Sequence, residues 1–196
     1  MATDGFDVAK VWLDYLVRLE LVHAYSVAYR LVDSGGLEYE PLVQALPGLE
    51  YIKMAAILDD ALEQYLDAKG LALPKRYHQT LGGRIRFCND KEILPPSVSL
   101  GSVGDLRNAL AHEPGSTTDW GTVQGDIALV QSALQHLGLI GVRPTLKVTG
   151  HRFAAYDQDK PGILLRQDYA VRVSDDNGAV VGQHRWTETI YGDEVT

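Results

Sequence analysis

This chain has one cysteine, no long apolar run and fewer basic than acidic residues. The single cysteine, Cys88, excludes an internal disulfide and a cysteine-based zinc cluster. Beside Phe87, it fits a small buried hydrophobe better than a nucleophile. No apolar run approaches the roughly 18 residues of a membrane span, and residues 1–5 contain no basic region ahead of an apolar stretch. We therefore expect a cytoplasmic protein without membrane association.

Acidic residues exceed basic ones: the chain has 26 Asp and Glu and 18 Lys and Arg, for a formal net charge of −8. This balance argues against a general nucleic-acid coat protein, which would be basic. One segment departs from it, since no acidic residue occurs between Asp67 and Asp90. We expect there either a solvated helix and loop or a phosphate-binding surface. The cations that would form such a surface are Lys75, Arg76, Arg84 and Arg86.

Apolar residues make up 45% of the chain and charged residues 22%, which is typical of a globular protein with a buried core. Apolar residues recur at helical spacing before Arg143-Pro144 and alternate after it. We predict a mainly α protein, with a helical bundle in residues 1–142. Residues 143–196 are predicted to form a β-hairpin or small antiparallel sheet, packed on the bundle because so short a segment buries little core alone.

Four longer helices and one short helix are expected in the first region. The longer helices are predicted at about residues 6–33, 49–68, 77–88 and 119–139, with a loop over 37–47. The first helix carries apolar residues on more of its circumference than one core contact requires. Either a kink or contact with a second chain would account for this, and we expect a homodimer.

The strand region has one clear turn signal. Asn177-Gly178 is a dipeptide favoured in two-residue type I′ hairpins. Counting back from this turn places Tyr169 opposite Trp186 and Val171 opposite His184. A further strand is expected at about residues 146–156.

The segment with the most specific chemistry is Arg107-Asn108-Ala109-Leu110-Ala111-His112. We predict that it ends a short helix, because Glu113 is followed by Pro114. Asn108 and His112 then share one helix face, and Arg107 lies about 140° around from His112. These side chains could simply cap backbone carbonyls or pair with Glu113 or Asp105. They would also suit the cleavage of a phosphodiester.

Cleavage of RNA would use each of the three side chains. The Arg107 guanidinium can hold two phosphate oxygens and stabilise the charge of the transition state. His112 can exchange a proton near neutral pH, and Asn108 can orient either group. This scheme requires no metal, and the six histidines show no ligand spacing. We therefore expect no metal and no cofactor.

The string Arg107–Glu113 resembles the Arg-Asn-x-x-Ala-His form of the HEPN domain motif, with every defined position matched. The resemblance covers residues 6–142 as architecture and seven residues as motif. It implies a helical bundle that dimerises through the motif region, with a ribonuclease site across the dimer. Arg107 and His112 would be catalytic and Asn108 supporting, and RNA would be the substrate.

The resemblance also bears on the biological setting. Toxin–antitoxin and antiviral systems are the settings it implies, with an antitoxin or regulatory protein as a further partner. Some HEPN toxins carry a tyrosine two residues after the histidine, where a nucleotidyltransferase modifies it. Pro114 occupies that position here, so we do not expect regulation of that kind. Other members of the family cut no RNA, and the alternative is a non-catalytic module that binds a nucleotide or a protein.

Overall fold

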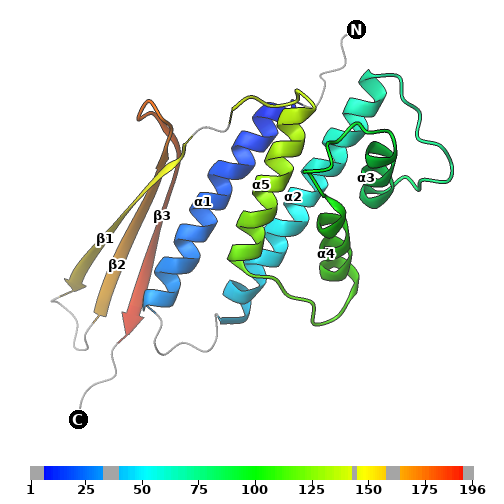
Figure 1. The fold of residues 1–196 in the computed structure, drawn as a ribbon. Helices are drawn as coiled ribbons and strands as arrows, with labels where there is room; N and C mark the ends of the chain where they lie inside the picture. Colours follow the sequence, from blue (N-terminus) through cyan, green and yellow to red (C-terminus); the bar gives the residue numbers. More distant parts are fainter. Residues whose placement is uncertain (1–6, 33–39, 143–144, 158–163, 192–196) are drawn as a thin grey trace, which may run out of the picture. The chain divides into compact units, whose positions relative to one another are not determined.

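Five helices followed by three strands make up residues 7–32, 40–142, 145–157 and 164–191, which the computed structural model describes (Figure 1). The predicted fold class is confirmed. The elements are α1 (Val8–Val32), α2 (Glu40–Ala68), α3 (Leu81–Asp90), α4 (Gly101–His112), α5 (Trp120–His136), β1 (Lys147–Asp157), β2 (Leu164–Ser174) and β3 (Val180–Tyr191). None of the described helices is both long and apolar enough to cross a membrane.

Contacts between residues divide the chain into two compact units, and α1 contributes to both. The helical unit comprises Met1–Tyr15 and Gly35–Arg143, and the sheet unit comprises Leu16–Ser34 and Pro144–Thr196. Trp12 of α1 is buried in the first unit, and Val17 is buried in the second. Because one helix serves two units, it carries apolar residues over a broad surface.

The core of the helical unit forms around α2, which contacts α3, α4 and α5. The apolar side chains buried there come mainly from α2 and α5. They include Tyr51, Met54, Leu58, Leu62, Val123, Ile127, Val130 and Leu134. Two side-chain hydrogen bonds lie in this core: Trp12 Nε1 donates to Gln131 Oε1, and the Tyr51 hydroxyl donates to Asp126 Oδ2 at 2.5 Å.

Helix α2 begins earlier than predicted. It starts at Glu40, and Pro47 lies within it, so the loop expected over 37–47 is wrong from residue 40 onward. Residues 37–39, like Phe6 and Asp33 at the ends of the first predicted helix, lie outside the described part. Proline removes one backbone hydrogen bond and usually disfavours a helix interior. Here Pro47 is buried, and α2 continues through it.

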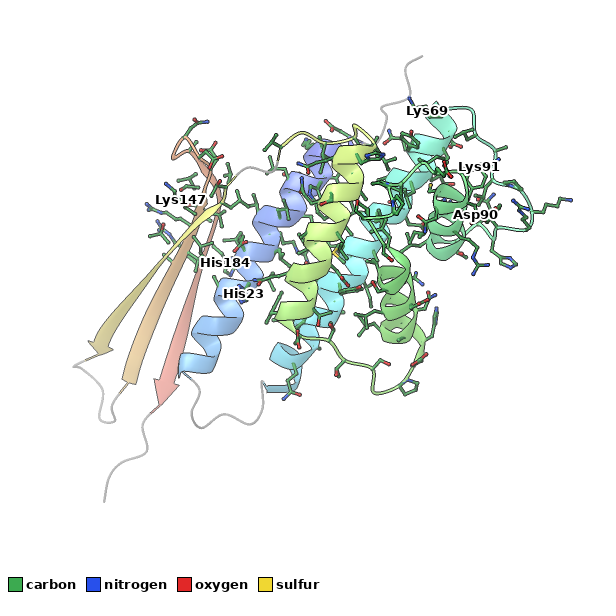
Figure 2. All side chains as sticks on the ribbon, viewed as in Figure 1. His23, Lys69, Asp90, Lys91, Lys147 and His184 are labelled. Atoms are coloured by element: carbon green, nitrogen blue, oxygen red, sulfur yellow. The ribbon has the colours of Figure 1, made fainter. Side chains whose placement is uncertain are left out.

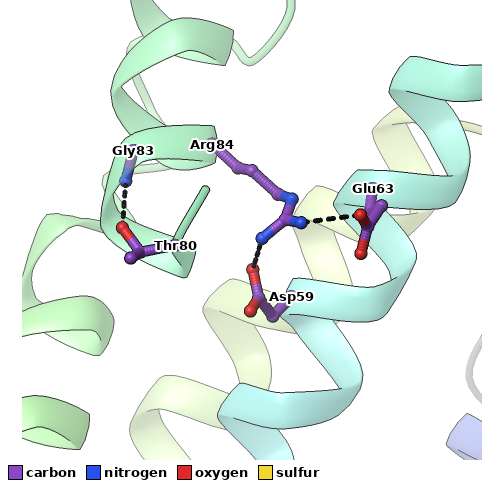
Figure 3. Close-up of polar contacts among 5 residues, drawn as sticks. All are labelled: Asp59, Glu63, Thr80, Gly83 and Arg84. Carbon is purple, nitrogen blue, oxygen red and sulfur yellow. Dashed lines mark hydrogen bonds and ion pairs between the residues drawn. The ribbon is translucent and has the colours of Figure 1, made fainter. Parts of the chain in front are cut away.

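Helix α3 begins at Leu81 rather than at residue 77, because Thr80 caps it. The Thr80 Oγ1 atom accepts a hydrogen bond from the Gly83 N–H at 3.2 Å (Figure 3). The segment before the cap is a tight turn, in which the Thr80 N–H donates to the His78 carbonyl at 2.8 Å. This turn lies so close to the helix that a Cβ atom on Gly83 would be 2.0 Å from the His78 oxygen.

The adjacent glycines of α3 are expected to respond in opposite ways to alanine. Gly83→Ala should lower the free energy of unfolding by about 1–3 kcal/mol, because the new methyl group displaces the backbone of His78. A Cβ atom on Gly82 would meet nothing within 4 Å, so Gly82→Ala should raise stability by about 0.4–1 kcal/mol through a less flexible unfolded chain. Urea unfolding of both variants measures the difference. Equal effects of the two substitutions would contradict this account.

The sheet unit is an antiparallel three-stranded sheet in the order β1-β2-β3, with α1 against one face. A Cβ atom on Gly182 of β3 would lie 2.4 Å from Val17 Cγ1 and 3.4 Å from Leu21 Cδ1 of α1. Val171 and Val173 of β2 are buried. The glycine therefore allows the helix to approach the sheet at this point.

The predicted strand pairing is confirmed, although the predicted turn type is wrong. Tyr169 pairs with Trp186 and Val171 with His184. Asn177 does not have the positive φ that a type I′ turn requires, whereas Gly178 has φ 79°. The loop has three residues, 176–178, closed by the Asp175 N–H bond to the Ala179 carbonyl. A register shift beside Val173 then restores the pairing expected from a two-residue loop.

Candidate active site

Helix α4 carries the Arg107–His112 motif and ends where the sequence predicts. His112 is its last residue, Glu113 is extended, and the Glu113 N–H donates to the Ala109 carbonyl at 2.8 Å. Pro114 follows and prevents the helix from continuing. His112 therefore lies at the C-terminal end of a helix, and it is exposed.

Two faces of α4 pack against other helices. A Cβ atom on Gly104 would lie 3.8 Å from Gly82 Cα of α3, and one on Gly48 of α2 would lie 3.6 Å from Leu110 Cδ2. At 100° per residue, Arg107 falls about 60° from both Gly104 and Leu110. Arg107 therefore lies on α4 between the face that α2 covers and the face that α3 covers, and it is half-buried.

Arg107 bonds to its neighbour Asn108. Its Nη1 atom donates to Asn108 Oδ1 at 3.1 Å. Among the described residues Arg107 forms no ion pair, and neither Asp105 nor Glu113 approaches it as the sequence had left open. The amide oxygen orients the guanidinium without neutralising its charge. An anion such as a phosphate can still bind this group bidentately.

Asn108 and His112 share the exposed side of α4. They are four residues apart, about 40° around the helix axis, and both are exposed. Arg107 lies about 140° from His112, as the sequence predicts for any regular helix here. The helix thus presents an amide and an imidazole together, with an uncompensated cation hydrogen-bonded to the amide.

The predicted phosphate-binding cations do not share one environment. Arg84 is buried, and its guanidinium pairs with Asp59 at 2.8 Å and with Glu63 at 2.9 Å (Figure 3). Burial raises the pKa of the Asp59 carboxyl, and Arg84 opposes that shift. Arg84 therefore joins α3 to α2, and a phosphate would have to displace two carboxylates to reach it.

The other three predicted phosphate-binding cations are exposed. Arg76 lies over the Tyr77 ring at 4.7 Å, and its Nη2 atom donates to the Tyr77 hydroxyl at 2.7 Å. That hydroxyl donates to Asp90 Oδ2 at 2.6 Å, which raises the Tyr77 pKa. Lys75 and Arg86 are exposed as well. These three side chains, without Arg84, remain candidates for contact with phosphate.

The burial of Arg84 could have been predicted from its helical spacing, although the run of positive charge around it suggested an exposed residue. Arg84 falls three residues after Leu81 and four before Cys88, both of which are buried. It therefore occupies a core position of α3. Asp59 and Glu63, four apart on α2, then form the complementary pair of carboxylates.

Other chemistry is limited among the described residues. They contain no group of three or more histidine, cysteine or acidic side chains able to hold a metal ion. Cys88 is buried, and desolvation raises the pKa of its thiol to about 11. At neutral pH the thiol is therefore protonated and a poor nucleophile.

Comparisons with known proteins add no family to this geometry. No family model, no curated protein and no solved structure matches this chain.

Proposed function

We propose that this protein is a metal-independent endoribonuclease of the HEPN type, with Arg107, Asn108 and His112 of α4 in its active site. The observation that carries the proposal is the state of Arg107. It is half-buried and hydrogen-bonded to Asn108, and it has no acidic partner among the described residues. A cation left uncompensated beside an exposed imidazole suits a phosphodiester substrate.

The reaction is attack of a ribose 2′-hydroxyl on the adjacent phosphorus. The hydroxyl proton leaves as the new P–O bond forms, and the bond to the 5′ oxygen breaks as that oxygen takes up a proton. The products are a 2′,3′-cyclic phosphate and a 5′-hydroxyl. His112 performs one of the two proton transfers, and Arg107 stabilises the charge that develops on the phosphoryl oxygens.

One histidine supplies only half of this acid–base chemistry. A homodimer that brings two α4 helices together would supply the second imidazole and a second guanidinium, as the HEPN resemblance implies. The cellular role that follows is that of a toxin or antiviral effector, held in check by an antitoxin or regulatory protein. The RNA substrate would contact Lys75, Arg76 and Arg86 as well as the motif residues.

The test is cleavage of a mixed-sequence RNA by the purified protein in EDTA. Wild-type protein should cut it and leave 2′,3′-cyclic phosphate ends, and a 2′-deoxy substrate should stay intact. His112→Ala should abolish cleavage. His136→Ala is the matched control, because His136 is also exposed and is the last residue of α5. It should cut as wild type does.

Other results would reject the proposal. Cleavage that persists in His112→Ala would exclude His112 from the reaction. If well-folded wild-type protein cuts no RNA, the alternative of a non-catalytic module that binds a nucleotide or a protein would be favoured.

A further inference from the structure

The sheet has one face that α1 does not cover. Val171, Val173 and Gly182 lie on the α1 side, so the residues that alternate with them lie on the opposite side. Figure 2 shows Lys147 directed away from α1 and His184 near it. We define the outer face by its described, exposed polar residues. They are Lys147, Thr149, Arg172, Gln183 and Arg185.

The strand register brings three cations of this outer face together. Thr149, Arg172 and Gln183 form one row across the three strands. Lys147 is two residues before Thr149 and Arg185 two residues after Gln183, so both are diagonal neighbours of Arg172. Diagonal neighbours lie about 7–8 Å apart, within reach of long side chains. A protein with a net charge of −8 thus has three cations close together at this end of one sheet face.

The two carboxylates that follow β2, Asp175 and Asp176, form no ion pair with these cations. Asp175 accepts hydrogen bonds from the Asn177 and Ala179 N–H groups, each at 2.9 Å. Asp176 accepts from the Thr145 N–H at 3.1 Å. Both carboxylates thus stabilise the turn. Among the described residues no ion pair involves Lys147, Arg172 or Arg185.

We propose that the outer face of the sheet binds the phosphate backbone of single-stranded RNA and holds the substrate of the proposed ribonuclease. The inference rests on the proposed function for the identity of the polyanion. Two arginines offer bidentate phosphate contacts, and Lys147 adds a point charge. These contacts are to phosphate rather than to base edges, so binding is expected to be independent of base sequence and strongly dependent on salt.

The experiment measures binding apart from cleavage. Full-length wild-type protein is titrated onto a fluorescent 2′-O-methyl RNA 20-mer, which has no free 2′-hydroxyl to attack, from 50 to 400 mM NaCl. Each lost phosphate contact reduces the slope of log K against log salt by about 0.7. R172Q/R185Q should therefore reduce the slope by about 1.4 and weaken binding about 25-fold at 0.1 M salt.

A charge-matched control separates this surface from net charge. K10Q/K69Q removes two exposed lysines of the helical unit and should bind RNA as wild type does. R172K/R185K keeps both charges and should keep the salt slope. If the double glutamine variant fails to fold, the single variants R172Q and R185Q replace it, and each should reduce the slope by about 0.7. Equal binding by wild type and R172Q/R185Q would overturn the proposal, as would an equal loss in K10Q/K69Q. Binding to anionic vesicles with no binding to RNA would overturn it too.

The two proposals fail in different ways. RNA binding that depends on Arg172 and Arg185, without cleavage of ordinary RNA, would support the sheet surface and reject the nuclease. Cleavage by wild type together with unchanged binding by R172Q/R185Q would reject the sheet surface alone.

Discussion

Arg107→Ala is expected to lower the rate constant of RNA cleavage by about 10²–10³-fold while the melting temperature stays near that of wild type. The guanidinium is proposed to act on charge that develops in the transition state, so kcat and kcat/KM should fall together. Its described hydrogen bond is to the adjacent Asn108 side chain. Among the described residues, truncation therefore breaks no ion pair and no hydrogen bond between helices.

Arg107→Lys separates charge from geometry at the same position. Lysine keeps the positive charge but loses the planar fork that binds two phosphate oxygens. We expect a smaller loss of rate than for alanine, measured in single-turnover cleavage with folding checked by circular dichroism. If Arg107→Ala melted at a lower temperature and still cut RNA at the wild-type rate, the motif would be a stability feature of the bundle.

The sheet variant R172Q/R185Q should differ from Arg107→Ala in its kinetics. If it cut RNA more slowly only at low RNA concentration, the effect would lie in KM and so in substrate binding.

Local signals in the sequence predicted most of the elements. Pro114 marks the end of α4, and Asp119, whose carboxylate accepts the Thr122 N–H at 2.7 Å, caps α5. The early start of α2 and the division of α1 between two units depend on packing between distant segments. A proline such as Pro47 argues against a helix in its local sequence, and its burial becomes known only from the fold.

In the candidate site, too, local features could be predicted from the sequence, whereas features that depend on packing could not. The relation of Arg107 to Asn108 and His112 follows from helix geometry alone, and the sequence could therefore predict it. The environment of Arg84 depends on how α3 meets α2. From charge alone Arg84 and Arg107 look alike. The structure gives Arg84 two carboxylate partners and gives Arg107 an amide.

Replacing both carboxylates that face Arg84 is expected to destabilise the protein more than replacing the arginine. D59N/E63Q should lower the free energy of unfolding by about 2–4 kcal/mol, because it leaves a buried guanidinium that cannot release its proton. The expected loss of stability is smaller than that for breaking a fully buried ion pair, because 33% of the Asp59 side chain and 53% of the Glu63 side chain are exposed. Urea unfolding of the variants measures these values.

Arg84→Met should cost less, because the two carboxylates it leaves are partly exposed and methionine fills the space of the aliphatic stem. Adding D59N/E63Q to Arg84→Met should then change stability by less than about 1 kcal/mol, since no buried guanidinium is left without a partner. If all three variants lost the same stability, the ion pair would make no separate contribution beyond packing.

The pH dependence of Arg84→Met provides an independent check. The pKa of Asp59 is already raised by burial, and Arg84 opposes that rise. Loss of Arg84 should raise this pKa further. A carboxyl with a raised pKa in the folded state binds its proton more tightly there, so its effect on stability becomes more unfavourable as pH rises through that pKa. The deficit of Arg84→Met relative to wild type should therefore be largest at neutral pH and narrow as pH falls toward the unfolded value of 3.8. A deficit that is constant with pH would show that losing Arg84 leaves the folded-state pKa of Asp59 unchanged, and the loss would then be one of packing.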